Sequence, residues 1–358
     1  MTLEDLSHHM AAWLDGTGSH ADLVVSTRVR LARNLGAFPF VHRAKENQLS
    51  EISAEVLAAG VRSEILREAS FFDTSHLPKI PRQVLVERHL ISPALAKVRG
   101  HRGVLVAHRE RCSVMINEED HLRIQTIQSG FSPQKAWELV NRMDDELSDS
   151  LAYAYSEKWG YLTTCPTNVG TGLRASVLIH LPGLVLTRQK DAALRGISQL
   201  GLVARGFYGE GSEIIGNLFQ ISNQRTLGQD EQETIDHLKK VSLELIRVEE
   251  LARAKLMREA RFQIEDKIWR AFGILENARL LTSQEFMNLA SAVRLGVSMG
   301  IISRPDIRIL NELMVTTQPS HLQQRAGKNL DPARRDALRA NLVRKRFHRA
   351  DPSAPEKP

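Results

Sequence analysis

Short segments in which hydrophobic and polar residues alternate are typical of strands, and they are spread over the first part of the chain. The clearest segment is residues 23–30, LVVSTRVR, which is also rich in β-branched residues. Further strands are predicted at residues 83–90, 103–108, 113–116, 121–127, 175–180 and 201–207. Helical spacing predicts helices at residues 3–14, 45–69, 132–151 and 191–199. This mixture indicates an α+β fold.

The pattern changes at about Gln229. From there the strand signals stop, and long amphipathic helices follow with breaks near Gly273, Ser283, Gly300 and Pro305. The sequence therefore predicts a short N-terminal helix at residues 1–19, a mixed unit with an antiparallel sheet at 20–254, a helical unit at 255–350 and a disordered tail at 351–358.

The positive net charge of the chain indicates that its binding partners are anionic. The formal net charge is +6 and the pI is about 9.4, which favours nucleotide phosphates, nucleic acid or an acidic protein. Aromatic residues make up only 5% of the sequence, which argues against a protein that binds by stacking on bases.

The cysteines and the N-terminus indicate the compartment. Two cysteines, Cys112 and Cys165, cannot form a disulfide framework, and no Cys/His cluster indicates zinc. The N-terminal residues carry acids and histidines where a signal peptide would carry a basic and then an apolar segment. No apolar run is long enough to span a membrane, so we expect a cytoplasmic protein.

Arginines at strand positions are the first candidates for chemistry, since neither a Walker A motif nor a GxGxxG motif is present. Arg28 and Arg30 lie two residues apart on one face of a strand, where two guanidinium groups repel each other unless an anion lies between them. Arg123, Arg174 and Arg205 follow at strand ends, two of them next to glycines that would let the backbone approach a ligand. A solvated strand face is the alternative.

An acidic turn, NEED at residues 117–120, supplies the opposite charge. A carboxylate such as that of Glu119 beside a phosphate pocket is favourable only if it faces a cationic substrate, and a guanidinium group fits this need. A solvated hairpin tip is the alternative.

Two further candidates lie later in the sequence. Glu210 or Glu213 could give a second carboxylate contact. Cys165 could supply a thiolate near the arginines, unless it is a buried structural cysteine.

Together, four blocks in this order resemble the motifs of the phosphagen kinases, the superfamily of creatine and arginine kinases. They are STRVRLARN at 26–34, NEEDHLR at 117–123, CPTNVGTGLRASV at 165–177 and RGFYGEGSE at 205–213, and the match covers about residues 20–254. Within that superfamily, the chain more closely resembles the McsB family of bacterial protein-arginine kinases.

The resemblance implies a phosphagen-kinase-like antiparallel sheet flanked by helices, with ATP and Mg²⁺ held by arginines. Glu119 would be the catalytic carboxylate, Glu210 a second acidic contact and Cys165 the active-site cysteine. No residue is assigned as a metal ligand. The implied nucleotide contacts are Ser26, Thr27, Arg28, Val29, Arg30, His89, Arg123, Arg174, Ala175, Ser176, Val177, Leu178, Arg205, Gly206, Phe207, Tyr208, Gly209 and Glu210.

Two departures from the small-molecule phosphagen kinases bear on the substrate. The STRVR block begins at residue 26, so the helical segment that encloses a free guanidino substrate is largely missing, and a protein side chain could enter. Tyr208 also stands where those kinases have a further arginine, which removes one phosphate contact.

The helical end resembles the McsB family as well. Residues 335–340 match its RDxxRA motif, which implies a regulatory phosphoarginine pocket formed by Arg335, Asp336, Ala337, Leu338, Arg339 and Ala340. Arg335 and Arg339 share a helix face and could hold one phosphoryl group, although a basic surface helix is the alternative. Apolar faces in this region suggest a homodimer interface, unless they pack on the catalytic unit.

The resemblance also implies partners: arginine-bearing protein substrates such as a CtsR-like repressor, an McsA-like activator and a Clp ATPase/protease that degrades marked substrates in the stress response. No membrane or direct nucleic-acid contact is expected. Two other functions stay open at this point, a kinase for free arginine or another small guanidine, and a basic nucleic-acid-binding or adaptor protein.

Overall fold

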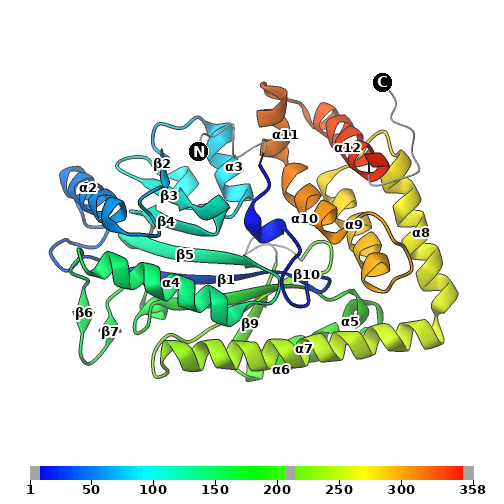
Figure 1. Cartoon of the computed structure of the whole chain (residues 1–358), viewed down its shortest axis with the longest axis horizontal. Helices are drawn as coiled ribbons and strands as arrows, with labels where there is room; N and C mark the ends of the chain where they lie inside the picture. Colours follow the sequence, from blue (N-terminus) through cyan, green and yellow to red (C-terminus); the bar gives the residue numbers. More distant parts are fainter. Residues whose placement is uncertain (1–8, 207–213, 350–358) are drawn as a thin grey trace.

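The computed structural model describes residues 9–206 and 214–349, and within them the chain forms an eight-stranded antiparallel sheet with helices on both faces (Figure 1). The strand order is β2-β3-β4-β5-β1-β8-β10-β9. The strands are β1 (Val24–Arg33), β2 (Ser70–Asp73), β3 (Gly103–Ala107), β4 (Cys112–Ile116), β5 (Leu122–Ser129), β8 (Leu173–His180), β9 (Leu202–Arg205) and β10 (Leu218–Asn223). β6 (Tyr155–Ser156) and β7 (Gly160–Tyr161) form a separate hairpin. The predicted α+β class with an antiparallel sheet is confirmed.

β1 is a central strand whose two faces differ. It pairs with β5 on one side and with β8 on the other. Val29 and Leu31 are fully buried and belong to the main hydrophobic core. Arg28 and Arg30 alternate with them and therefore point to the opposite face. The sequence pattern of this strand thus sets which face of the sheet is apolar and which carries charge.

Helices α2 (Glu46–Arg62), α4 (Pro133–Ser148) and α7 (Glu231–Glu259) cover the apolar face of the sheet, and their buried residues join its core. α4 begins with Pro133, whose missing N–H costs nothing at a helix start. α7 begins at a capping box, in which Asp230 accepts the N–H of Glu233 at 2.7 Å. Two shorter helices, α5 (Pro182–Leu186) and α6 (Lys190–Gln199), connect β8 to β9.

A second core joins the helical end of the chain to the other face of the sheet. It contains Val25, Ile127 and Leu178 from the sheet, Trp13 from the short helix η1 (Ala12–Leu14), and residues of the last helices. Those helices are α8 (Arg261–Asn277), α9 (Ser283–Ser298), α10 (Ile307–Thr316), α11 (Pro319–Ala326) and α12 (Pro332–Arg349). In Figure 1 they lie beside the sheet on the side opposite to α4 and α7. None of the described helices has the length and apolar character needed to cross a bilayer.

Some predicted elements are wrong. Residues 83–90 were predicted as a strand, but helix α3 (Lys79–Glu87) covers most of this segment. Its β-branched Val84 and Val86 are buried together with Leu85, so packing against a small third core outweighs strand propensity. The helical end breaks at Ala260 and not at Gly273, which lies inside α8 on an open surface. The short strands β2 and β10 were not predicted.

Two 3₁₀ turns contribute residues to the cleft described below, η2 (Leu95–Lys97) and η4 (Pro166–Asn168), and a third, η3 (His108–Glu110), lies between β3 and β4. The first part of the N-terminal helix predicted at residues 3–14 lies outside the described residues, and only η1 is seen in its second part.

A buried ion pair fastens β1 to α4. Asp144 of α4 accepts hydrogen bonds from Nε and Nη2 of Arg33 at 3.0 and 2.7 Å, and the guanidinium group lies 3.4 Å from the ring centroid of Tyr161. The two side chains are 2% and 7% exposed, so removal of one partner would leave a buried charge without compensation.

We therefore expect Asp144→Ala to lower the free energy of unfolding by about 3–5 kcal/mol, measured by urea denaturation. Glu244→Ala, which removes the exposed Glu244–Arg247 pair of α7, is the matched control and should change nothing measurable. Equal losses in the two variants would contradict the role of the Arg33–Asp144 pair.

Candidate active site

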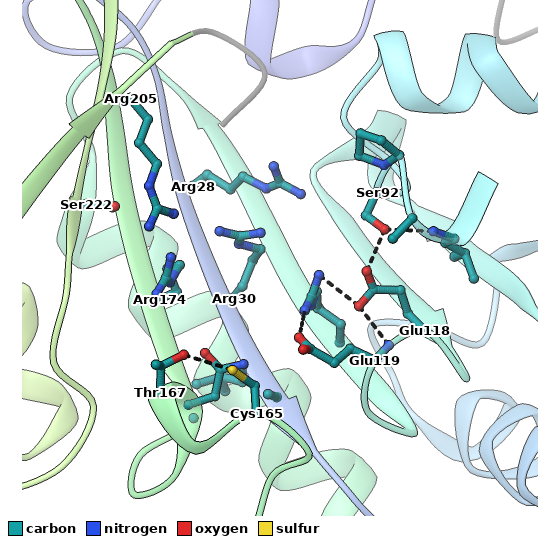
Figure 2. Close-up of a pocket in the computed structure, with 18 of the residues that line it drawn as sticks. Arg28, Arg30, Ser92, Glu118, Glu119, Cys165, Thr167, Arg174, Arg205 and Ser222 are labelled. Atoms are coloured by element: carbon teal, nitrogen blue, oxygen red, sulfur yellow. Dashed lines mark hydrogen bonds and ion pairs between the residues drawn. The ribbon is translucent and has the colours of Figure 1, made fainter. Parts of the chain in front are cut away.

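A cleft of about 630 Å³ lies on the polar face of the sheet. Figure 2 shows Arg28, Arg30, Arg174 and Arg205 directed into it, with Glu118 and Glu119 at the other side and Cys165 along its edge. The lining residues are Arg28, Arg30, Leu31, Ala32, Ser92, Pro93, Ala94, Leu95, Val98, Glu118, Glu119, Arg123, Cys165, Thr167, Asn168, Gly172, Arg174, Arg205, Gln220 and Ser222. Segments far apart in sequence therefore meet in one cavity.

The arginine side of the cleft is a cluster of like charges. Arg30 of β1 pairs in register with Arg174 of β8, so their side chains stand on the same face of neighbouring strands. Burial lowers the pKa of Arg28 to about 9, with a further contribution from Arg123. Burial, and then Arg28, Arg123 and Arg174, lower the pKa of Arg30 well below its ordinary value. Such a cluster is stabilised by an anion that lies between the guanidinium groups.

Arg28 is held in place by neighbours. Gln125 of β5 accepts a hydrogen bond from Nε of Arg28 at 3.0 Å, and the carbonyl oxygen of His89 accepts one from Nη2 at 3.3 Å. The Nε2 group of Gln125 donates to the same carbonyl at 2.9 Å. Gln125 was missed by the sequence analysis, although it lies two residues after Arg123 and so on the same strand face.

The acidic side is built from the turn between β4 and β5. Nη1 of Arg123 lies 2.8 Å from Oε2 of Glu118, and Nη2 lies 3.2 Å from Oε2 of Glu119. Ser92 donates to Oε1 of Glu118 at 2.5 Å, so Glu118 is held on two sides. Glu119 is the more open of the two carboxylates, with a side chain 42% exposed. Burial raises the pKa of Glu119 although Arg123 opposes this, and the carboxylate is therefore a better proton acceptor than an ordinary one.

Asp120 of the acidic turn, and His121 after it, hold the turn in place. Asp120 accepts hydrogen bonds from Nδ2 of Asn34 at 2.7 Å and from the backbone N–H of Thr164 at 2.6 Å. His121 accepts the backbone N–H of Leu35 at 2.9 Å through Nδ1. These bonds fix the turn to the end of β1 and to the segment that leads into Cys165.

The glycine-rich loop before β8 packs against protein backbone. Gly172 has φ +64°, and a Cβ atom there would lie 2.6 Å from the carbonyl oxygen of Ala32. At Gly170, with φ +108°, a Cβ atom would lie 2.1 Å from the carbonyl oxygen of Thr226. Gly172 therefore lets the loop approach β1, and because it also lines the cleft, the expectation that it serves approach to a ligand stays a prediction. Cys165 precedes this loop, and its Sγ lies 3.0 Å from Oγ1 of Thr167.

A narrow slot continues from the cleft, since Arg28 and Gln220 line both. Its other walls are Trp13, Ser26, His89, Ile127, Ser176 and Leu178. Burial, followed by Arg28 and Arg30, lowers the pKa of His89 to about 3, so its ring is neutral. Trp13 lies edge-on to this ring, with ring centroids 5.6 Å apart. Trp13, Gln220 and Ser222 were not predicted, because nothing in the sequence marks their partners.

Strand alternation separates the predicted nucleotide contacts into two groups. Val29, Ala175 and Val177 are fully buried in the main core, so their side chains cannot reach a ligand in the cleft. Thr27 is also buried, and its hydroxyl donates to the carbonyl of Gly130 at 2.7 Å. Gly206 follows Arg205 directly. Phe207, Tyr208, Gly209, Glu210 and Glu213 lie outside the described residues.

The predicted regulatory residues lie on α12. The guanidinium group of Arg339 is buried and donates to the carbonyls of Thr317 at 2.9 Å and Leu281 at 2.7 Å, and to Asp336 at 2.6 Å. Arg335, one turn earlier, is half-buried. Ala340 is buried in the second core, Leu338 packs at its edge and Ala337 is exposed.

Among residues 9–206 and 214–349, no group of three or more His, Cys, Asp or Glu side chains could hold a metal ion by itself. The carboxylate oxygens among the residues that line the cleft are those of Glu118 and Glu119. Mg²⁺ prefers oxygen ligands and is commonly held by one or two carboxylates together with phosphate oxygens and water, so this donor set fits Mg²⁺ that arrives with a phosphate ligand.

Two family models match the chain. The model of the ATP:guanido phosphotransferase C-terminal catalytic domain matches residues 52–252. The model of the protein-arginine kinase McsB C-terminal domain matches residues 261–357. The two matches follow each other along the chain. Most residues of the cleft lie in the first, although Arg28, Arg30, Leu31 and Ala32 precede it, and α8 to α12 lie in the second.

Curated relatives are similar over nearly their full length. The protein-arginine kinase of Symbiobacterium thermophilum is 48% identical over 348 residues, which cover 96% of this chain and 98% of the relative. That of Halothermothrix orenii is 46% identical over 349 residues, 97% of this chain and 100% of the relative.

Solved structures are similar in fold. A duplicated taurocyamine kinase from Schistosoma mansoni with bound transition-state-analogue components has a TM-score of 0.57 at 27% identity, over 69% of this chain and 35% of that one. Lombricine kinase has a TM-score of 0.59 at 24% identity, over 71% and 72% of the two chains, which shows a shared fold.

The charge cluster leads to a prediction about stability. Arg30 makes no hydrogen bond or ion pair with any described residue and is repelled by three arginines, so Arg30→Gln should raise the melting temperature of the ligand-free protein by about 1–2 °C, or about 1 kcal/mol. The rise in melting temperature that inorganic triphosphate causes should shrink in the same variant. Differential scanning fluorimetry measures both.

Arg195→Gln, on the exposed surface of α6, is the control for loss of one positive charge and should leave both quantities unchanged. A ligand-free Arg30→Gln protein less stable than the native one would show that the cluster is not under repulsion.

Proposed function

The chain belongs to the ATP:guanido phosphotransferase family and within it to the protein-arginine kinases, and from this premise we propose how its cleft divides the work of phosphoryl transfer. The protein is an ATP-dependent phosphotransferase that acts on arginine side chains of proteins. The observation that carries the proposal is that one cleft presents a cluster of arginines at one side and two carboxylates at the other.

The arginine side is proposed to hold the phosphates of ATP. Phosphoryl transfer requires alignment and neutralisation of charge more than covalent help from the protein. Arg28, Arg30 and Arg174 project from neighbouring strands at one face, and guanidinium groups match phosphate oxygens with pairs of hydrogen bonds. The slot with His89 and Trp13 has a volume of only about 20 Å³, room for about one water molecule, so the nucleoside end would lie in the main cleft of about 630 Å³. Mg²⁺, when bound with ATP, would neutralise phosphate charge, and the carboxylate of Glu118 could hold it together with phosphate oxygens and water.

The acidic side is proposed to hold the substrate guanidinium. This group is a poor nucleophile while it carries its positive charge. Glu119 would accept two of its N–H groups, orient one nitrogen towards the γ-phosphorus and take the proton that this nitrogen loses as the new P–N bond forms. The bond between the γ-phosphorus and the bridging oxygen breaks, and ADP leaves with that oxygen. Cys165 lies along the same cleft and is proposed to contact the substrate guanidinium.

Glu210 stays a proposed second acidic contact. The implied partners also stay proposals: a CtsR-like repressor as substrate, an McsA-like activator, a Clp protease that receives the marked proteins in a stress response, and a cytoplasmic location. The RDxxRA residues of α12 are proposed to bind phosphoarginine, with Arg335 as the more accessible cation because Arg339 already donates to Thr317, Leu281 and Asp336.

The proposed homodimer has support from α8. Phe262 and Trp269 lie seven residues apart, and so on one helix face, and are 82% and 51% exposed. Exposed aromatic side chains on one face are typical of a surface that another protein covers. The partner proposed is a second copy of this chain.

We expect Phe262→Glu to convert a dimer into a monomer, because a charge would be buried against the partner without compensation. Light scattering coupled to size-exclusion chromatography measures the mass. Val61→Glu replaces an apolar residue of α2 that is 73% exposed and should leave the dimer intact. A native protein of monomer mass at micromolar concentration would exclude this interface.

The catalytic proposal is tested at Glu119. Glu119→Gln keeps the shape of the side chain but removes the charge and the proton acceptor, so kcat for phosphorylation of a basic protein should fall by at least about 100-fold. ADP affinity should change little, since the carboxylate faces the acceptor. Phosphosite mass spectrometry at neutral pH measures phosphoarginine, and calorimetry measures ADP binding.

The pH profile gives an independent readout. Activity needs the carboxylate form of Glu119, and because burial raises its pKa, activity of the native enzyme should fall as the pH is lowered through that raised pKa. Glu119→Gln should lack this acid limb. Glu157→Gln, in the exposed turn between β6 and β7, is the control and should retain native rate and profile. Full activity of Glu119→Gln would refute the assignment.

A further inference from the structure

A buried carboxylate joins the end of α3 to the start of α11. Glu87 accepts the backbone N–H of Ser320 at 2.8 Å, the backbone N–H of His321 at 3.0 Å and Nδ1 of His321 at 2.7 Å. Its side chain is 11% exposed and the His321 ring 2%. The first N–H groups of a helix lack partners within the helix, and a negative charge there is favourable. Glu87 therefore caps the N-terminus of α11, a helix that begins 232 residues later in the sequence.

The next residue is anchored in the same way. Arg88 forms a buried ion pair with Glu110, with Nε 2.8 Å from Oε2, and donates to the carbonyl of His9 at 2.9 Å. Its Nη1 lies 3.5 Å from Nε2 of His321. Breaking buried charge pairs of this kind is costly, so the backbone at Glu87 and Arg88 has little freedom to move.

The residue after these anchors carries the contact to the cleft. His89 has φ +60°, a backbone conformation that a non-glycine residue holds only when its surroundings enforce it. In this conformation its carbonyl oxygen accepts from Nη2 of Arg28 at 3.3 Å and from Gln125 at 2.9 Å. The position of that carbonyl, and with it the direction of the Arg28 guanidinium, depends on the anchored residues before it.

The start of α11 is held from its other side by α12. Nε of Arg339 donates to the carbonyl of Thr317 at 2.9 Å, and Thr317 immediately precedes Gln318, the N-cap of α11. An unbroken series of hydrogen bonds and covalent links therefore runs from α12 through α11 and Glu87 to Arg28.

We propose that Glu87 is a positioning residue for the nucleotide: by binding the start of α11 it fixes the His89 turn, and this turn fixes Arg28. The inference rests on the proposed role of Arg28 in phosphate binding. It makes the helical end of the chain a required part of the nucleotide site, because α11 supplies the donors on which Glu87 is anchored.

The main test is Glu87→Ala. Loss of one well-placed charged hydrogen-bond donor on a phosphate is worth about tenfold in affinity, so the Kd for ADP and the KM for ATP should rise about tenfold. The kcat and the KM for the protein substrate should stay within about twofold, because among the described residues the segment after His89 contacts the acidic side at Glu118, to which Ser92 donates, and not at Glu119. The milder Glu87→Gln keeps an oxygen for Ser320 and should recover much of the affinity.

The sign of the effect separates positioning from simple electrostatics. Removal of a negative charge at a distance from the phosphates would tighten ADP binding, whereas loss of positioning weakens it. Unchanged or tighter ADP binding in both Glu87 variants would overturn the proposal.

Glu249→Ala is the matched control for a merely structural role. Glu249 is fully buried, accepts the N–H groups of Gly183 at 2.8 Å and Leu184 at 2.9 Å, and pairs with Arg253 at 2.7 Å. None of these residues lines the cleft. Both alanine variants should lower the melting temperature, but only Glu87→Ala should weaken ADP binding. An equal loss of ADP affinity in Glu249→Ala would assign the effect to general destabilisation and overturn the inference.

A double-mutant cycle locates the path. If Glu87 acts through Arg28, then Glu87→Ala should cause no further loss of ADP affinity once Arg28→Ala is present, whereas independent effects would multiply and overturn the inference. Arg28→Ala with native ADP affinity would instead refute the proposed function of the arginine cluster, so the two failures are distinguishable.

Discussion

Mutual repulsion among arginine side chains is the constraint on which the active site depends. Guanidinium groups on β1 and β8 are held on one face of the sheet, and the pKa values of Arg28 and Arg30 are lowered first by burial and then by the neighbouring arginines. The repulsion among the arginines is offset by burial of apolar side chains on the opposite face, where Val29, Leu31 and their neighbours pack in the main core. A strand with one apolar and one charged face can keep such a cluster folded until a polyanion arrives.

The same contrast between the two strand faces explains why residues of one sequence motif have different roles. In STRVRLARN, Arg28 and Arg30 line the cleft, whereas Arg33 is bound to Asp144 and Asn34 to Asp120. The first two arginines meet a space for ligand, and Arg33 meets a buried carboxylate that has the opposite charge. The motif therefore contains residues that line the cleft and residues that hold the end of β1 against its neighbours.

The sequence was informative where a local pattern is sufficient. The alternation in residues 23–30 predicted a strand with two arginines on one face, and the acidic turn was placed between two strands that the structure contains as β4 and β5. Residues 83–90 were assigned to a strand because Val-Leu-Val favours one locally, whereas burial among residues distant in sequence selects a helix. Trp13 and Glu87 could not be found for the same reason: each is defined by partners that only the folded chain brings near.

The pairing of Arg30 with Arg174 has a consequence for how this protein can diverge. Side chains along a strand have a period of two, so inserting or deleting one residue in the middle of β1 would turn the cleft arginines into the hydrocarbon interior and push valine and leucine outward. The pairing of β1 with β8 already contains one register shift between Val24 and Ser26, but residues 26–31 pair without interruption, so a change in length there would move the arginines off the cleft face. The spacing of β1 is therefore under stricter selection than the identity of many of its residues, and lineages of this enzyme should vary in length at the loops while this strand keeps its count.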